Sequence, residues 1–230
     1  MEKITSIAQA VDQIKDGMSI MVGGFLGCGS AHQVLEELSK RDVKNLTVMC
    51  NDGGLIGGPN GDDYYGVAKL IHTKQVKKLY ATHVGLNAEI GEQMMEGTLE
   101  VVLVPQGSFA EMIRAGGAGL GGVLTPTGVG TIVQEAEHVH SVIEIEGKKY
   151  LLEKPLKADV ALIYGTKIDE AGNMCYTGST RNFNEFMAMA ADIVIAEAEE
   201  IVPVGSISPD DVVTPGILVD HIVKGGPVRG

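Results

Sequence analysis

Hydrophobic positions along this chain follow two spacings. Short continuous apolar runs, typical of buried strands, alternate with stripes spaced three and four residues apart, typical of helices. This alternation predicts an α/β fold, in which an open, mainly parallel sheet is flanked by helices and carries a small β-hairpin insertion. No linker or change of composition interrupts it, so residues 1–230 are expected to form a single domain. Strands are expected at 20–22, 46–50, 79–82, 100–105, 159–164 and 193–196, and helices at 6–15, 30–38, 67–71, 88–95, 108–114 and 186–191. Residues 217–223 fit a helix or a strand.

Polar residues mark the expected starts of three helices. Each start carries a serine followed three residues later by Gln or Glu, which is the spacing of a capping box. These pairs are Ser6 with Gln9, Ser30 with Gln33, and Ser108 with Glu111. The second and third pairs each follow a predicted strand, so two strand-to-helix junctions are expected. Ligands of open α/β sheets bind outside the carboxyl ends of strands, where such junctions meet.

The first junction is rich in glycine. Its residues are Gly23, Gly24, Phe25, Leu26, Gly27, Cys28 and Gly29. Such a loop turns tightly, and we expect it to leave its backbone amides uncovered for a ligand at the start of the following helix. Close packing between strand and helix is the alternative, and the sequence leaves it open. The spacing fits neither a dinucleotide fingerprint, since His32 stands where the third glycine belongs, nor a P-loop, which needs a lysine.

The second junction ends in a glutamine, whose side chain carries an amide group. Residues 100–105 are nearly all apolar after the first, which predicts a strand buried on both faces, and Gln106 follows at its carboxyl end. A glutamine in this position can contact a ligand or brace its own turn. Two such junctions favour a ligand-binding site, but they do not identify the ligand or the reaction.

Two other segments carry polar side chains. Residues 51–63 are expected to form a long loop whose three aspartates make turns and solvated charges, because they lack the alternation of a calcium loop. His138 and His140 lie on an extended run that turns at residues 146–147. We expect a surface hairpin and no metal site there, since no acid or cysteine nearby completes a ligand set. His32 is expected near any ligand of the glycine loop, whereas His72 has no evident partner.

Charge and composition argue against some classes of binding partner. The net charge of -12 and the pI near 4.9 argue against nucleic acid and anionic membranes as partners. The apolar runs are too short to span a bilayer, and the polar N-terminal residues do not resemble a signal peptide. The three cysteines, odd in number and far apart, fit a reducing compartment, with Cys28 expected as a small buried thiol. A cytoplasmic protein is predicted.

Several segments match a known family in residues and order. They are 16–17 with 23–29, 51–52, 105–107, 113–119, 125–128, 169–173, 181–184 and 214–216. Together they resemble the family I coenzyme A transferases of the 3-oxoacid type, alpha subunit. Residues 119–124 resemble the acetate/butyrate–acetoacetate branch more than the succinyl-CoA branch.

The resemblance implies a function in short-chain fatty acid metabolism. CoA, a substrate and not a permanently bound cofactor, moves between an acyl-CoA and a free short-chain carboxylate such as acetate, butyrate or acetoacetate. The family reaction is ping-pong, and its nucleophile is a glutamate of the beta subunit. No segment here resembles the Ser-Glu-Asn-Gly motif that carries it. The chain is therefore expected to act with a beta subunit in an α2β2 heterotetramer.

The resemblance also assigns residues. Gln106 matches a glutamine that stabilises the oxyanion of the tetrahedral intermediate, and residues 23–29 match the segment described as CoA-binding. The family signature ends in proline where this chain has Ala31, and residues 57–63 are longer than in relatives. The alternatives are the alpha chain of a succinyl-CoA:3-oxoacid or 3-oxoadipate CoA-transferase, a sugar-phosphate isomerase, and a ligand-sensing domain. An isomerase needs its own acid/base carboxylates and basic phosphate ligands, and a sensor of this kind usually carries a basic DNA-binding segment.

Overall fold

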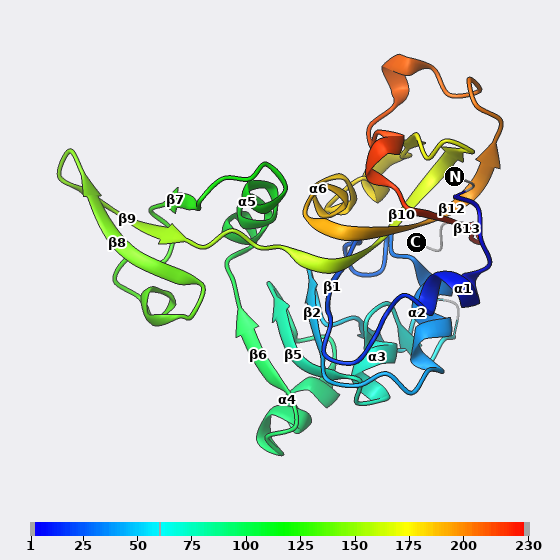
Figure 1. The fold of residues 1–230 in the computed structure, drawn as a ribbon. Helices are drawn as coiled ribbons and strands as arrows, with labels where there is room; N and C mark the ends of the chain where they lie inside the picture. Colours follow the sequence, from blue (N-terminus) through cyan, green and yellow to red (C-terminus); the bar gives the residue numbers. More distant parts are fainter. Residues whose placement is uncertain (1–2, 60, 228–230) are drawn as a thin grey trace.

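A parallel sheet forms the centre of the molecule (Figure 1). The computed structural model describes residues 3–59 and 61–227, and within them eight strands form this sheet in the order β13-β12-β10-β1-β2-β5-β6, with β11 added to β10. All neighbours along that order are parallel, and β11 is antiparallel to β10. The strands are β1 (Ser19–Val22), β2 (Leu46–Cys50), β5 (Val76–Ala81), β6 (Glu100–Leu103), β10 (Ala158–Asp169), β11 (Met174–Cys175), β12 (Ala191–Val202) and β13 (His221–Lys224). The predicted α/β fold with an open, mainly parallel sheet is confirmed.

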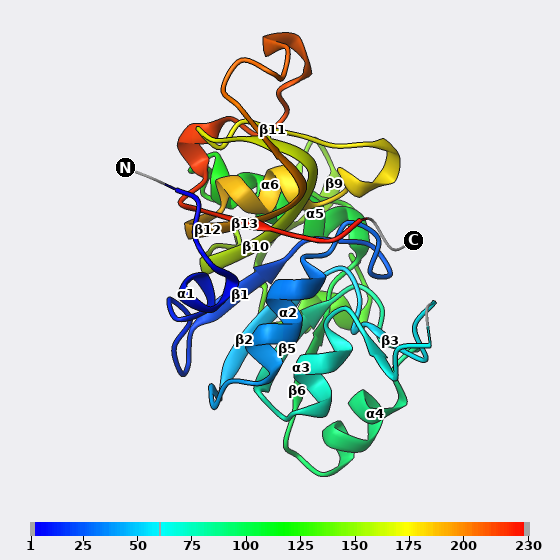
Figure 2. The ribbon, with the colours of Figure 1, turned by 90° about the vertical axis from the view of Figure 1, so that its right-hand side faces the viewer.

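Helices cover both faces of the sheet, and each face has its own hydrophobic core (Figure 2). Alternate residues of a strand enter opposite cores, so that Ile20 and Val22 of β1 pack on one side and Met21 on the other. The first core receives α1 (Ile7–Val11), α2 (His32–Ser39), α3 (Ala68–His72) and α4 (Ala88–Met95), and the second receives α5 (Gln106–Gly117) and α6 (Asn184–Met189). No helix in the described part of the chain is long and apolar enough to cross a membrane.

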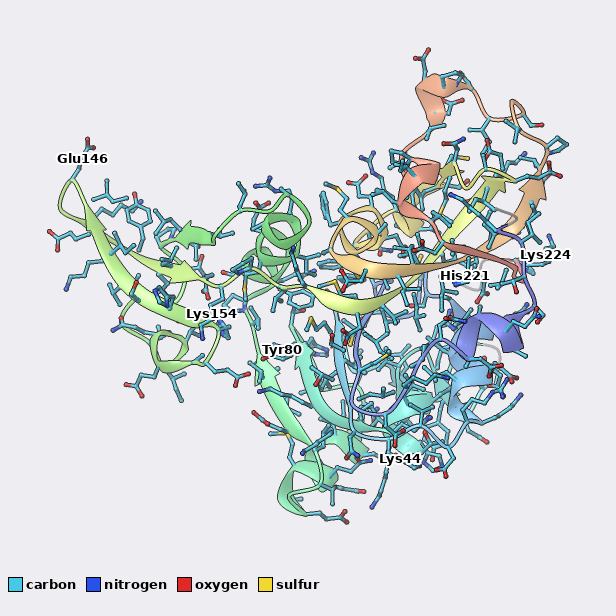
Figure 3. All side chains as sticks on the ribbon, in the orientation of Figure 1. Lys44, Tyr80, Glu146, Lys154, His221 and Lys224 are labelled. Carbon is cyan, nitrogen blue, oxygen red and sulfur yellow. The ribbon has the colours of Figure 1, made fainter. Side chains whose placement is uncertain are left out.

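A second, smaller sheet projects from the body as an arm (Figure 1). It contains β7 (Val123–Thr125), β9 (Lys148–Glu153) and β8 (Val139–Ile145) in that order, together with the 3-10 turn η1 (Ile132–Glu135). The expected β-hairpin is therefore present, with β7 as a third strand. Figure 3 shows Glu146 at the tip of the arm and Lys154 near its base. At that base, the Glu137 carboxylate accepts hydrogen bonds from Lys78 and from the Tyr80 hydroxyl of β5.

One strand differs from its prediction. β6 was expected to be buried on both faces, yet β5 is its only partner among the described strands, so β6 lies at the edge of the sheet. Leu103 is 54% exposed as a result. An apolar run indicates a strand but does not distinguish a central strand from an edge strand, because neighbours that are distant in sequence decide its position.

Helix starts were predicted correctly in part. Ser6 and Gln9 form the expected capping box at α1. The capping box expected from Ser108 is wrong, because α5 begins two residues earlier, at Gln106, and Ser108 lies inside the helix with its hydroxyl buried. Glu111 instead forms an exposed ion pair with Arg114.

Two further segments differ in detail from their predictions. The segment expected as a long loop, residues 51–63, contains a short strand, β3 (Leu55–Ile56), which pairs antiparallel with β4 (Tyr64–Tyr65) directly after it. The segment left open between helix and strand is a 3-10 turn, η4 (Gly216–Leu218), followed by β13.

Candidate active site

Gln106 lies at the carboxyl edge of the sheet, as the first residue of α5. The side chain is exposed, and its Nε2 atom donates a 3.1 Å hydrogen bond to Oδ1 of Asn51, the residue that follows β2. Asn51 is buried, and the hydroxyl of Thr82, just after β5, donates to its backbone carbonyl. Three strand ends therefore fix the direction of the Gln106 amide.

A chain of hydrogen bonds connects Gln106 with the glycine loop. Nδ2 of Asn51 donates to Oδ2 of Asp52 at 3.0 Å, and the same oxygen accepts the backbone N–H of Leu26 at 2.7 Å. The other carboxylate oxygen of Asp52 accepts the N–H of Gly54. Asp52 forms a turn, as predicted, but it is 7% exposed and not solvated, and it braces the loop. The two predicted junctions thus belong to one hydrogen-bonded assembly.

Most backbone amides of the glycine loop are already engaged in hydrogen bonds within the protein. The N–H of Gly23 donates to the carbonyl of Leu162, and that of Gly24 donates to Oδ1 of Asn182. Phe25 and Cys28 exchange backbone hydrogen bonds with each other. The expectation that the loop leaves these amides uncovered is wrong for the residues named here, since the loop uses them to hold its own shape.

Two asparagines just before and at the start of α6 hold the other side of the loop. Nδ2 of Asn182 donates to the carbonyl of Cys28, and Nδ2 of Asn184 donates to the carbonyl of Gly29. A Cβ atom on Gly23 would lie 1.8 Å from Oδ1 of Asn184, so glycine is required there for close packing. Sequence reasoning assigned these asparagines no role, although segment 181–184 belongs to the family resemblance.

Side chains, not amides, face outward at the tip of the loop. Phe25 is 42% exposed and Leu26 is 37% exposed, whereas the four glycines around them are buried. Cys28 is half-buried, less enclosed than predicted, and its Sγ atom lies 3.5 Å from Oγ of Ser179. The loop therefore presents a small apolar tip beside the open surface around Gln106.

The start of α2 is held by a residue that sequence reasoning missed. The predicted Ser30–Gln33 capping box is wrong, because the Ser30 hydroxyl donates to the carbonyl of Gly23 across the loop. Oε2 of Glu197, from β12, instead accepts the backbone N–H groups of Gln33 and Val34, both at 3.0 Å. Burial raises the pKa of the Glu197 carboxyl to about 7, although the two N–H donors act to lower it.

A cavity of about 300 Å³ lies behind the glycine loop. Its walls include Gly27, His32, Tyr65, Lys69 and Glu197. The ring of His32 stacks on Tyr65 with centroids 4.3 Å apart, and its Nε2–H donates to the carbonyl of Gly27. His32 thus supports the glycine loop through the carbonyl of Gly27.

Two of the remaining histidines, His138 and His72, pair with acids that the sequence did not indicate. His138 is buried in the arm and not on its surface as expected, and its Nδ1 atom lies 2.7 Å from Oε2 of Glu153. His140 is exposed, and His72 pairs with Glu89. Among the described residues, no group of three or more His, Cys, Asp or Glu side chains could hold a metal ion.

Comparison with known proteins shows which family and which proteins this chain is similar to. The family described as "Coenzyme A transferase" matches residues 4–225. The chain is 49% identical to the alpha chain of the acetoacetyl-CoA:acetate/butyrate CoA transferase of Clostridium acetobutylicum, over 91% of this chain and 92% of that protein. It is 45% identical to the alpha chain of the acetate CoA-transferase of Escherichia coli, over 96% of both chains. It is 43% identical to the corresponding chain of a succinyl-CoA:3-ketoacid coenzyme A transferase of Helicobacter pylori, over 96% of this chain and 91% of that protein.

The fold is similar to that of a solved transferase. An acyl-CoA transferase from Escherichia coli, crystallised as a thioester complex with CoA, matches with a TM-score of 0.85 at 22% identity. The match covers 99% of this chain and 50% of that one, so the chain spans about half of the solved polypeptide.

Proposed function

Because the chain belongs to the coenzyme A transferase family, we propose that it is the alpha subunit of a heteromeric enzyme that moves CoA between a short-chain acyl-CoA and a free carboxylate. Residues 1–230 form a single alpha-subunit domain in this proposal. The beta subunit supplies the nucleophilic glutamate, and the two chains assemble as an α2β2 heterotetramer in the cytoplasm. CoA is a substrate, and no permanently bound cofactor is needed.

The observation that carries this proposal is the connection between Gln106 and the glycine loop through Asn51 and Asp52. This hydrogen-bonded connection lies at the carboxyl edge of a parallel sheet, where ligands of such folds bind. The surface beside Gln106 is open, since a Cβ atom on Gly107 would meet nothing within 4 Å. Oriented polar groups around an open space suit a half-site that a second chain completes.

In the proposed reaction, Gln106 binds the oxyanion. The beta-subunit glutamate attacks the thioester carbonyl, and negative charge develops on its oxygen. The CoA thiolate then leaves, and a mixed anhydride forms. The thiolate next attacks the glutamyl carbonyl, which releases the first acid and leaves a glutamyl-CoA thioester for the second acid to attack. Nε2 of Gln106 carries two protons, and Asn51 accepts only one of them, so the other can donate to the oxyanion.

Residues 23–29 are proposed to form one wall of the CoA cleft. Because the amides of Gly24 and Leu26 are already engaged inside the protein, the proposal places the loop's contacts with CoA at its surface, where Phe25 and Leu26 are exposed. The alkyl part of CoA suits such an apolar tip. Gly23 and Gly24, whose N–H groups are engaged, then serve the shape of the cleft and not the direct binding of phosphate.

The relatives support acetate, butyrate or acetoacetate as the acids. The two proteins that carry such names are 45% and 49% identical to this chain, and the succinyl-CoA:3-ketoacid relative is 43% identical. Because the last value is close to the others, exchange with succinyl-CoA is the alternative to test. A 3-oxoadipate enzyme is a further alternative, since one chain of the 3-oxoadipate CoA-transferase of Acinetobacter baylyi is 41% identical.

The proposal is tested by reconstitution. The purified chain is expected to transfer no CoA from acetoacetyl-CoA to acetate, and transfer should appear when a beta subunit is added in equal amount. The control is the same beta subunit with its nucleophilic glutamate changed to alanine, which should bind the chain without restoring transfer. CoA transfer by the single purified chain, or a complete pair that transfers CoA between none of these acids, would contradict the proposal.

A further inference from the structure

Glu197 occupies a position where an acid is unexpected. It lies on β12 between β10 and β13, opposite Tyr164 and Val223, and is 1% exposed. Its side chain lies beneath the start of α2 and forms part of the wall of the cavity behind the glycine loop. A buried carboxylate is costly unless it is paired with strong donors. The donors here are the backbone N–H groups of Gln33 and Val34, at the positive end of the α2 dipole.

The fold makes room for this carboxylate. A Cβ atom on Gly225, next to β13, would lie 2.5 Å from Cγ of Glu197 and 2.7 Å from its Oε1 atom. Ala31, the N-cap of α2, offers no side-chain hydrogen bond. Glu197 therefore replaces a local cap with one that comes from another strand of the sheet.

This cap acts next to the glycine loop. His32, the residue before Gln33, donates to the carbonyl of Gly27, and Ser30 closes the loop by donating to the carbonyl of Gly23. A shift at the start of α2 therefore moves both loop contacts. We propose that Glu197 is a positioning residue, whose carboxylate holds the start of α2 and, through it, the glycine loop in the shape that binds acyl-CoA. This inference rests on the proposed function.

Other charged groups face Glu197 from the neighbouring elements. They are Tyr164 of β10, His32 and Glu36 of α2, Lys69 of α3, and Asp62 and Tyr65 around β4, which line the same cavity, and Glu199 of β12, which acts on Tyr164. Lys69 is already paired with Glu36 at 2.6 Å. The N–H groups of α2 are thus the donors that bind the Glu197 carboxylate directly.

The sign of the pH effect follows from burial. The pKa of Glu197 is raised to about 7 from 4.5, so the carboxyl takes up a proton as the pH falls from 8 to 6. Protonation removes the charge that interacts with the helix dipole, and the start of α2 is then held less firmly. The free energy of unfolding changes with pH in the opposite sense. Because burial disfavours the charged form of Glu197, this group lowers folding stability as the pH rises from 4.5 towards 7. A fall in acyl-CoA binding at low pH would thus not reflect a loss of overall stability through this group.

Kinetics of the complete α/β enzyme test the inference with Glu197→Gln, which keeps the shape but not the charge. At pH 8, the KM for acyl-CoA should rise about three- to tenfold with little change in kcat, and it should vary little between pH 8 and 6. The wild-type KM should rise towards the same value at pH 6. Glu200→Gln, which removes an exposed charge from the same strand, should match the wild type. Equal pH profiles of KM for Glu197→Gln and the wild type would overturn the inference.

Hydrogen exchange separates this inference from the proposed function. In the chain without its partner, the amides of residues 23–39 should exchange faster in Glu197→Gln than in Glu200→Gln at pH 8. Unchanged exchange in these residues would refute the positioning role. If the α/β pair transferred no CoA, the proposed function would fail, and hydrogen exchange would still decide the role of Glu197.

Discussion

Replacement of Gln106 by alanine is expected to lower the kcat of the α/β enzyme about 100- to 1,000-fold, which is the usual cost of losing one oxyanion donor. The side chain is exposed, and within residues 3–59 and 61–227 it makes one hydrogen bond, to Asn51. Its loss should therefore leave the stability of the chain and its assembly with the beta subunit nearly unchanged. The KM for acyl-CoA should also change little, because the donor acts on charge that develops only in the transition state.

Steady-state kinetics and size-exclusion chromatography of the pair measure these quantities. Gln134→Ala is the matched control, since Gln134 is also exposed but lies in the arm, where it accepts a hydrogen bond from the backbone N–H of Gly130. It should keep the wild-type kcat. A Gln106→Ala enzyme that retained the wild-type kcat would remove this residue from the mechanism.

Replacement of Asn184 by alanine is expected to lower the free energy of unfolding by about 3 kcal/mol, because it leaves several buried backbone groups without partners. Asn184 is fully buried. It accepts the N–H of Tyr164 and donates to the carbonyls of Gly29 and Thr180. The glycine loop should become mobile together with the start of α6.

Urea unfolding followed by circular dichroism measures this loss. Arg181→Ala is the control, because it removes an ion pair with Glu185 whose arginine is 56% exposed, and such pairs contribute about 0 to 1 kcal/mol. A loss below about 1 kcal/mol for Asn184→Ala would mean that the loop does not depend on this asparagine.

The features that could be predicted from the sequence are those that depend on the order of strands and helices along the chain. Gln106 and the glycine loop each follow a parallel strand, and parallel strands bring their carboxyl ends to one edge, so the proximity of the two could be expected. The helix at 88–95 was predicted with its observed bounds, because the local apolar spacing decides them. The cap of α1 by Ser6 was likewise local.

The sequence did not indicate what depends on distant partners. Glu197 caps a helix that begins more than 160 positions earlier, and the nearby serine gave a plausible but wrong local cap. The inward direction of the loop amides depends on Asp52 and Asn182, which lie on other segments. The turn that Asp52 makes with Gly54 was predicted, whereas its bond to Leu26 across the loop was not.

The central claim is that this chain provides the oxyanion donor and one wall of the cleft, while the attacking carboxylate comes from another polypeptide. Intact-mass analysis of both subunits, after the pair reacts with acyl-CoA and is quenched in acid, tests it most directly. We predict one CoA attached to the beta subunit and none to this chain, with the adduct strongly reduced in the Gln106→Ala pair at early times. A CoA adduct on this chain would contradict the account.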